Sequence, residues 1–349
     1  MKFPSFSLLF FSADYADPSR GKYDLLLSAS KFADANGFEA VWMPERHFQP
    51  FGGIYANPAV TAAALATITS RVALRAGSVI LPLHNPVRVA EEWAMVDHLS
   101  SGRAGVAFGS GWNVQDFVLA PTQYRERRRE TRKALNVIKS LWAGERVIFE
   151  NGAGNATAVA TYPQPFQEII PIWMTAESPE TFVFAGEIGA NVLTAMLHQS
   201  VEVATKNIKV YRETLEKAGF DPHLRTVTLM QHSFLCSEIE AAREQGFAAY
   251  LTYVKSNLAL QEANARGLGS SAAPSDLDLD EQDITSLAES AFERHVSSTG
   301  LIGTMTTLRD RLDLWASMDV DEIACLVDFT DDPVAVHNTL EIVAKCNRP

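Results

Sequence analysis

The 349-residue sequence predicts an α/β fold of one kind, a closed (β/α)8 or TIM barrel. Short apolar segments alternate with amphipathic helical segments, and this pattern indicates a parallel sheet with crossover helices. Eight such pairs follow one another along the chain, and eight units favour a closed barrel over an open sheet. A bare barrel needs about 250 residues, which leaves roughly 100 for insertions. We expect a single domain over residues 1–349.

The eight predicted strands are short and apolar, as strands covered on both faces are. The first is interpreted as a buried strand rather than a signal peptide, because its charged region is minimal and Pro4 interrupts it. In chain order the strands are Phe6–Phe11, Phe38–Met43, Val72–Leu81, Arg103–Phe108, Ile170–Met174, Asn191–Met196, Thr226–Cys236 and Val320–Val327.

The predicted helices carry apolar residues at helical spacing. Gly37 and Gly219 end two of them, and Pro86 begins another at a position where a missing N–H costs little. The helices are Gly21–Asn36, Pro58–Thr69, Pro86–Leu99, Arg125–Trp142, Pro179–Ile188, Val201–Ala218, one that begins near Glu238, and Pro333–Lys345.

Two insertions interrupt this alternation. After the fourth helix, Val147–Phe149 and Ala158–Tyr162 are expected to form a hairpin around the Gly- and Asn-rich loop Asn151–Asn155. The second insertion, at about 255–300, separates the seventh and eighth strands and includes the acidic segment Gly267–Asp283. We expect that segment to act as a lid over the site, since long barrel insertions often do; a solvated linker is the alternative.

Composition excludes several classes of function. Lys and Arg number 30 and Asp and Glu 42, so the formal net charge is −12 and general nucleic-acid binding is disfavoured. The three cysteines are far apart and lack metal-binding spacing, so neither a disulfide framework nor a metal site is expected. No apolar run reaches the roughly 18 residues that a membrane span needs. A cytoplasmic protein without a membrane partner is the expectation.

In a barrel of this kind, chemistry is located at the carboxyl ends of the strands. Glu45, Arg46 and His47 directly follow the second strand, and an acid, a cation and an imidazole together suit acid–base or anion-binding work. The alternative is an ion pair on the rim with a surface histidine. Gly109, Ser110 and Gly111 follow the fourth strand, where they either let a flat ligand approach the backbone or form a tight turn.

Two further segments suit an anion. Ser178 and Thr181 stand at the start of the helix after the fifth strand, where hydroxyls and free N–H groups can hold a phosphate. Ordinary capping of the helix is the alternative, and both can hold at once. Among the charged residues 125–130, one arginine can point inward to a phosphate, and the spacing does not say which.

Three longer runs resemble the bacterial luciferase-like flavin monooxygenase family. They are GFEAVWMPERHFQPFGGIYANPAVTAAALA, LRAGSVILPLHNPVRVAEEWAMVDHLSSGRAGVAFGSGW and PIWMTAESPETFVFAGEIGANVL. The resemblance is collinear from Met1 to about Gly219 and weaker beyond. The run SPETFVFAGEIGANVLTAMLHQSVE is most similar to a subgroup associated with polyketide and non-ribosomal peptide biosynthesis.

The resemblance implies a reaction with two small co-substrates. Reduced FMN (FMNH₂) is supplied by a separate flavin reductase and reacts with O₂ to a C4a-peroxyflavin, which oxygenates a natural-product intermediate, free or tethered to a carrier protein. The protein binds the flavin, keeps water away and positions the substrate. Two alternatives remain open: a deazaflavin-dependent oxidoreductase with the same barrel, and a catalytically silent flavin-binding subunit. Family members commonly form homodimers through the helices that flank strands two and three.

The resemblance also assigns roles to residues. It implies a non-proline cis peptide at Gly77–Ser78 beneath the flavin ring. The cofactor-binding residues that it implies are Gly77, Ser78, Gly109, Ser110, Gly111, Arg128, Glu177, Ser178 and Thr181. Arg128, Ser178 and Thr181 are the phosphate ligands among them, with Glu177 beside them.

The sequence departs from the family at two positions. Arg46 stands where luciferases have their catalytic histidine, and His47 matches the second histidine of that pair. A guanidinium does not act as a base near neutral pH, so Arg46 is expected to stabilise an anion, and light emission is not expected. Ser110 stands where luciferases have a second phosphate-binding arginine. This departure implies that the phosphate is bound more weakly at this position, or that residues elsewhere complete its binding. Glu45, Arg46 and His47 are the predicted catalytic residues.

Overall fold

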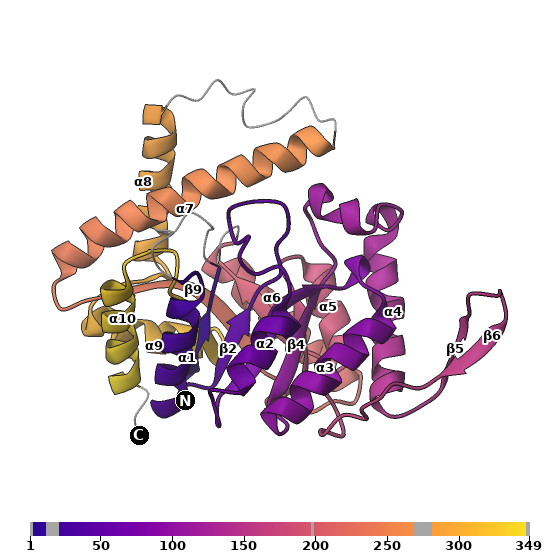
Figure 1. The fold of residues 1–349 in the computed structure, drawn as a ribbon. Coiled ribbons are helices and arrows are strands. Elements are labelled where there is room, and N and C mark those ends of the chain that lie inside the picture. The colour runs from indigo at the N-terminus through magenta and orange to yellow at the C-terminus, as the bar shows by residue number, and fades with distance from the viewer. Residues whose placement is uncertain (1–2, 12–20, 197–198, 269–280, 347–349) are drawn as a thin grey trace.

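The structure is a computed structural model that describes residues 3–11, 21–196, 199–268 and 281–346. The strands of its main sheet are β1 (Ser5–Leu9), β2 (Ala40–Met43), β3 (Ala73–Ile80), β4 (Ala104–Gly109), β7 (Ile172–Thr175), β8 (Asn191–Ala195), β9 (Val227–Leu235), β10 (Leu301–Gly303) and β11 (Glu322–Leu326). Eight of these described strands, all except β10, pair in parallel and close into a barrel. The predicted (β/α)8 barrel is therefore confirmed (Figure 1).

Helices cover the outside of the barrel (Figure 1). Their bounds are α1 (Asp24–Ala35), α2 (Pro58–Ala66), α3 (Pro86–Ser100), α4 (Arg127–Trp142), α5 (Pro179–Glu187), α6 (Val201–Lys217), α7 (Ile239–Gly267), α8 (Glu281–Ser297), α9 (Met305–Ser317) and α10 (Pro333–Cys346). Short 3₁₀ helices are η1 (Leu81–Leu83), η2 (Val114–Leu119), η3 (Tyr124–Glu126) and η4 (Pro222–Leu224). The starts of α2 and α3 follow a common rule: Asn57 and Asn85 accept N–H groups of the first turn, and a proline follows each.

A buried ion pair fills the interior of the barrel. Nη1 of Arg75 lies 2.7 Å from Oε2 of Glu322, and the guanidinium is stacked 5.0 Å from the Trp42 ring and 4.4 Å from the Trp173 ring. Oε1 of the same glutamate accepts hydrogen bonds from Ser7 and from the Trp42 indole. Because both charges are paired and hydrogen-bonded, their burial is compensated. The interior is a packed core, so chemistry is confined to its open end.

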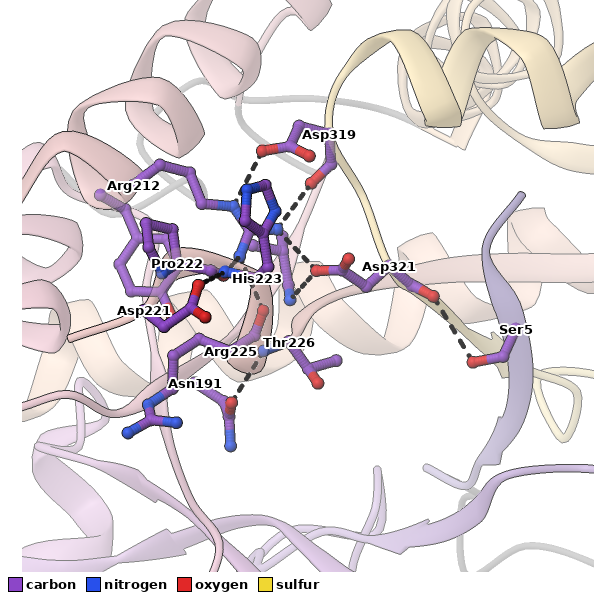
Figure 2. Close-up of polar contacts among 12 residues, drawn as sticks. Ser5, Asn191, Arg212, Asp221, Pro222, His223, Arg225, Thr226, Asp319 and Asp321 are labelled. Atoms are coloured by element: carbon purple, nitrogen blue, oxygen red, sulfur yellow. Dashed lines mark hydrogen bonds and ion pairs between the residues drawn. The ribbon is translucent and has the colours of Figure 1, made fainter. Parts of the chain in front are cut away.

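The amino-terminal end of the barrel is closed by a second polar network (Figure 2). Arg212 of α6 forms ion pairs with Asp319 at 2.8 Å and with Asp321 at 2.6 Å, just before β11. The backbone carbonyl of Asp321 in turn accepts the N–H of Ser5, at the start of β1. Burial lowers the pKa of Arg212, but the two carboxylates outweigh it and the net pKa is raised. This network ties the ends of several strands together far from the carboxyl end.

Helix α7 crosses the carboxyl end of the barrel (Figure 1). It follows β9, and its Tyr253 and Leu260 belong to the same buried cluster as Trp42 inside the barrel. Near its carboxyl end, Oδ1 of Asn264 accepts the backbone N–H of Val114 in η2, at 2.7 Å. The helix therefore spans the barrel mouth from β9 to the loop that follows β4.

The second insertion differs in part from expectation. The sequence predicts a helix from about Glu238 and a loop-like insertion at 255–300, whereas α7 continues to Gly267 and α8 begins at Glu281. Most of the acidic segment Gly267–Asp283 lies outside the described residues. Strand β10 and helix α9 were not predicted; β10 pairs with the end of β9 outside the barrel. A covering element over the mouth is present, but it is a long helix rather than a loop.

The remaining boundaries agree within a few residues. The predicted hairpin is confirmed as β5 (Val147–Glu150) paired with β6 (Ala156–Val159). Strand β1 begins and ends slightly earlier than the predicted first strand. Where one continuous helix was expected, η3 precedes α4. Over the described part of the chain, no helix combines the length and apolar character needed to cross a membrane.

Candidate active site at the carboxyl end of the barrel

Glu45 organises the loop that follows β2. Its Oε1 accepts hydrogen bonds from Nε2 of His47 at 2.8 Å and from Nε2 of His84 at 2.6 Å, while its Oε2 accepts the backbone N–H of Ile80. Burial opposes the charge on Glu45, but the bonds from both histidines outweigh it and the pKa of Glu45 is lowered. The pKa of His84 is raised, because the bond to Glu45 outweighs burial. One carboxylate therefore fixes two imidazoles and joins the ends of β2 and β3.

Arg46 does not pair with its neighbour Glu45. Its guanidinium lies 4.9 Å from the Phe11 ring centroid and 5.5 Å from that of Trp112, and the residue is only 8% exposed. Burial lowers the pKa of Arg46, and the charge of Asp116 on η2 opposes that effect. Its Nε is buried and has no hydrogen-bond partner among the described residues. Glu45 and Arg46 are buried and the His47 side chain is 11% exposed, while His47 and Glu45 do form an ion pair. The catalytic role of the three residues stays a prediction.

The strand beside this loop is irregular where the resemblance implied it. The peptide bond Gly77–Ser78 is cis, and the register of β3 against β4 shifts between Gly77 and Val79. Across the sheet, a Cβ added at Gly109 would lie 3.1 Å from Oγ of Ser78. The implied cis peptide is thus confirmed, next to a glycine that leaves space above it.

Two glycines mark the end of β4. Gly111 has φ +75°, and a Cβ there would lie 2.7 Å from Ile80 and 2.9 Å from Phe117. Both the backbone angle and the close packing therefore require glycine. Ser110 is half-buried between Gly109, the last residue of β4, and Gly111. Contact with a flavin stays a prediction for all three residues.

The start of α5 leaves its hydroxyl groups free of the helix backbone. Ser178 occupies the N-cap position but makes no side-chain capping bond; its Oγ lies 3.2 Å from Oγ1 of Thr181. Glu180 in the first turn is exposed, and its pKa is lowered by its own backbone N–H, by the Ser178 hydroxyl and by the charge of Arg128. Ser178 and Thr181 therefore meet at this helix start, and the charge of Arg128 on α4 is felt by Glu180 in its first turn. That these three residues bind a phosphate, with the exposed Glu177 before them, stays a prediction.

Neighbouring arginines on α4 are engaged elsewhere. Arg127 donates to the carbonyls of Gly111 and Tyr124, and Arg129 pairs with Glu126 and Glu130. These contacts leave Arg128 as the candidate that the resemblance implies, and its role as a phosphate ligand stays a prediction.

Sequence reasoning missed the partners of the catalytic loop. His84, Asp116 and Trp112 were given no role beside Glu45 and Arg46. A signal was present for two of them, since His84 and Trp112 lie within four residues of the predicted strand ends Leu81 and Phe108. No group of three or more His, Cys, Asp or Glu side chains suited to a metal is found within the described ranges.

The family follows from a comparison over nearly the whole chain. The profile of the luciferase-like monooxygenases matches residues 1–322. The chain belongs to the luciferase-like monooxygenase family. The resemblance noted from three sequence runs is thereby confirmed, and it extends across the barrel described above.

Individual members of the luciferase-like family are similar over part of their length. The oxygenase component of a flavin-dependent trigonelline monooxygenase from Acinetobacter baylyi is 30% identical, over 63% of this chain and 61% of that protein. An F420-dependent glucose-6-phosphate dehydrogenase from Kineococcus radiotolerans is 32% identical, over 52% of this chain and 53% of that protein. The chain thus spans less than two thirds of the length of these curated relatives.

Solved structures of the family share the fold. The monooxygenase RslO1 from Streptomyces bottropensis superposes with a TM-score of 0.76 at 24% identity, covering 98% of both chains. At that identity the likeness establishes that the two chains share the barrel fold.

Proposed function

We propose that this chain is the oxygenase component of a two-component FMN-dependent monooxygenase. It would use reduced FMN from a separate flavin reductase, together with O₂, to oxygenate a small organic substrate. One observation carries the proposal: His47 and His84 both form hydrogen bonds to Oε1 of Glu45. The buried guanidinium of Arg46 follows Glu45 in the same loop. The flavin-dependent relative and the family profile support it.

The residues present fit an FMN phosphate and ring. Arg128 supplies one positive charge at the start of α5, and Ser178 and Thr181 supply hydroxyls that do not cap the helix. Free N–H groups at a helix start favour an anion. Gly77, Ser78 and Gly109 at the ends of β3 and β4, followed by Ser110 and Gly111, are the residues proposed to contact the ring. The flavin would supply the activation of O₂, and the protein would supply everything that controls it.

His47 and Arg46 divide that control. Since Nε2 of His47 donates to Glu45, its Nδ1 is the atom that can accept and return a proton. Arg46 keeps its charge even when buried, and its unpartnered Nε can donate to an oxygen anion at the mouth. Helix α7 above them excludes water, which strengthens both interactions.

The finer parts of the proposal concern substrate and assembly. The likeness of the run SPETFVFAGEIGANVLTAMLHQSVE to the natural-product subgroup favours a natural-product intermediate as substrate, free or tethered to a carrier protein. A homodimer through α2 and α3 is supported by the exposed side chains Val60, Met95 and Leu99 on those helices.

A deazaflavin-dependent oxidoreductase is the second candidate. It is favoured by the F420-dependent relative, which is as similar to this chain as the flavin-dependent one. A catalytically silent flavin-binding subunit is the third, and the convergence of Glu45, His47 and His84 argues against it, since a silent subunit needs no such network.

A titration separates these candidates. We expect the purified protein to bind FMN more tightly than FAD or NAD, and reduced FMN more tightly than oxidised FMN. Mixing the complex of reduced FMN with O₂ should consume O₂ at a rate different from that of free reduced FMN. Tighter binding of FAD would contradict the single phosphate site. Binding of F420 with no effect on the oxidation of reduced FMN would favour the second candidate.

A further inference from the structure

His232 of β9 lies at the point where α7 and α8 meet the barrel. Its imidazole meets four rings edge to face: Tyr253 and Tyr250 of α7 at centroid distances of 4.5 Å and 5.5 Å, His295 of α8 at 5.4 Å, and Phe329 after β11 at 5.2 Å. His295 is in turn stacked on Tyr250, with centroids 5.9 Å apart. These five residues, called the imidazole cluster below, therefore join both helices to β9.

Helices α7 and α8 are held to each other separately from the main core (Figure 1). Ion pairs on the surface link α7 to α8, from Arg243 to Glu293 and from Lys255 to Glu281. Their buried side chains pack with Phe234 in a small hydrophobic cluster of their own. Among the described residues, none from α7 or α8 belongs to the main core between the barrel and the outer helices. A unit attached in this way can open locally while the main core stays folded.

Both imidazoles are buried in a form that does not suit a positive charge. Nε2 of His232 and Nε2 of His295 are buried and have no hydrogen-bond partner among the described residues. Burial holds the pKa of His232 well below its usual range, and His295 lowers it further. Burial also lowers the pKa of His295 to about 4, with a contribution from Arg311 of α9, although a bond to the backbone of His232 opposes this. Both rings are therefore neutral at neutral pH.

The two tyrosines of the imidazole cluster stay neutral as well. Burial raises the pKa of Tyr250 and of Tyr253 above the ordinary value of 10.0. The charged groups that act on them are Arg294 for Tyr250, and Arg46 and Asp328 for Tyr253. The two imidazoles are thus the members of the cluster that can change their charge in weak acid.

We propose that the imidazole cluster is an acid-sensitive latch that releases α7 and α8 from the barrel mouth. Once released, both imidazoles are in water and have the ordinary pKa of 6.5, whereas in the closed form the pKa of each is lowered. Below pH 6.5 the open form therefore binds more protons. The closed form keeps its full stability above pH 6.5 and loses it as pH falls toward the closed pKa of His295, about 4.

The latch itself needs no flavin. Its consequence, which is the entry of water over Arg46 and His47 when α7 leaves, rests on the proposed monooxygenase function. The test is therefore made on the full chain without flavin.

Hydrogen exchange followed by mass spectrometry measures the opening, at about pH 7.5 and about pH 5.5, with correction for the intrinsic exchange rate at each pH. We expect the protection of the α7 and α8 amides to fall by about tenfold or more, because a pKa of 6.5 in the open form and about 4 in the closed form of His295 alone gives that factor. The amides of β1 to β4 should keep their protection. Unchanged protection of α7 and α8, or an equal fall in these strands, would overturn the latch.

Two variants assign the effect to the imidazoles. His232→Phe/His295→Phe replaces both by rings that take up no proton, so α7 and α8 should be equally protected at both pH values. His295→Phe alone should show a smaller fall than the wild type, and it carries the test if circular dichroism shows that the double variant does not fold. His223→Phe substitutes an exposed histidine of η4 at the opposite end of the barrel (Figure 2) and should respond as the wild type does. A wild-type response in either of the first two variants would overturn the latch.

Failure of the latch and failure of the proposed function give different results. FMN titration at about pH 7.5, where the latch is closed, tests the function alone. Opening of α7 and α8 in acid by a protein that binds no FMN would overturn the proposed function and leave the latch assigned. FMN binding together with exchange that does not depend on pH would overturn the latch and leave the function in place.

Discussion

The buried side chain of Glu45 holds several parts of the site in place. Its two carboxylate oxygens take three N–H donors from two strand ends, so the loop, the imidazoles and the start of η1 are fixed together. Removing such a carboxylate would leave several donors without their acceptor, which is costlier than the loss of one bond. The tests at this scale therefore substitute the two histidines one at a time, so that Glu45 keeps one histidine partner in each variant.

His47→Ala should increase the release of hydrogen peroxide. We expect mixing of reduced FMN and O₂ on this variant to release hydrogen peroxide about ten- to a hundredfold faster than on the wild type, because the proton carrier at the mouth is lost. Peroxide release after stopped-flow mixing measures the effect, while FMN affinity stays the same. His337→Ala removes an exposed histidine that pairs with Glu341, and serves as control. Wild-type peroxide release in His47→Ala would mean that the histidine only orders its loop.

His84→Gln should reveal a pH-dependent share of stability. The folded pKa of His84 is raised, so its contribution is complete below the unfolded value of 6.5 and is lost as pH rises through the folded pKa. The pKa of Glu45 is lowered, so its contribution is present above 4.5 and lost as pH falls through the folded value. Urea unfolding of wild type and variant should differ most between about pH 4.5 and 6.5. A constant difference across pH 5 to 9 would contradict this coupling.

Residue identity was predictable where the chemistry is local. The tripeptide Glu45-Arg46-His47 stood out because all three side chains follow one strand. The partners of that tripeptide did not, since His84 is 39 residues away and Asp116 lies on η2 after β4. Only the order of strands around the barrel brings them together, and a single sequence does not show which rotamers meet.

At the scale of elements, the meeting of α4 and α5 is the feature with the clearest functional consequence. Ser178 and Thr181 lie 3.2 Å apart, Oγ to Oγ1, at the start of α5, and the charge of Arg128 at the start of α4 lowers the pKa of the nearby Glu180. A phosphate-bearing ligand should therefore depend on Arg128 more strongly than a ligand without phosphate.

Arg128→Ala should weaken FMN by about 1.5 to 3 kcal/mol, the range for a hydrogen bond to a charged group. Riboflavin, which lacks the phosphate, should bind wild type and variant equally. Fluorescence quenching of each flavin measures both affinities, and Arg129→Ala, whose side chain pairs with Glu126 and Glu130, is the neighbouring control. An equal loss for riboflavin would assign Arg128 a structural role.

Elements with one buried face were predicted well, and α7 was not. Strands β2 and β4 consist of apolar residues and glycine, and β1 and β3 are mostly apolar, so their positions follow from the sequence. Helix α7 packs on the barrel core through Tyr253 and Leu260, on η2 through Asn264 and on α8 through an ion pair from Lys255. Because α7 has contacts on several sides, its apolar residues do not follow the regular spacing on which helix prediction depends. Only the start of the helix was therefore predicted.

For the whole molecule, strict β/α alternation was sufficient to predict the barrel, because parallel strands with right-handed crossovers leave few arrangements. The place of β10 was not predictable. It is a three-residue strand that continues the second half of β9 outside the barrel, and such a short segment carries no pattern of its own.

Assembly is the prediction that belongs to this scale. Val60 on α2 and Met95 and Leu99 on α3 are 65%, 55% and 51% exposed, and the two helices pack against each other. Met95→Lys/Leu99→Lys should shift the protein from dimer to monomer in sedimentation velocity, because buried charges oppose the interface. Leu224→Lys, which replaces an exposed leucine on η4, is the control. A wild-type protein that sediments as a monomer at high concentration would contradict the dimer.

The indole pair inside the barrel gives the fold an optical signature. Trp42 on β2 and Trp173 on β7 meet edge to face with centroids 5.2 Å apart, although β3 and β4 separate their strands in the sheet. Two chromophores this close couple electronically and produce a paired circular-dichroism band that disappears once the strands separate. Closure of the barrel can therefore be followed during unfolding without any label, independently of the helices that dominate the ordinary signal.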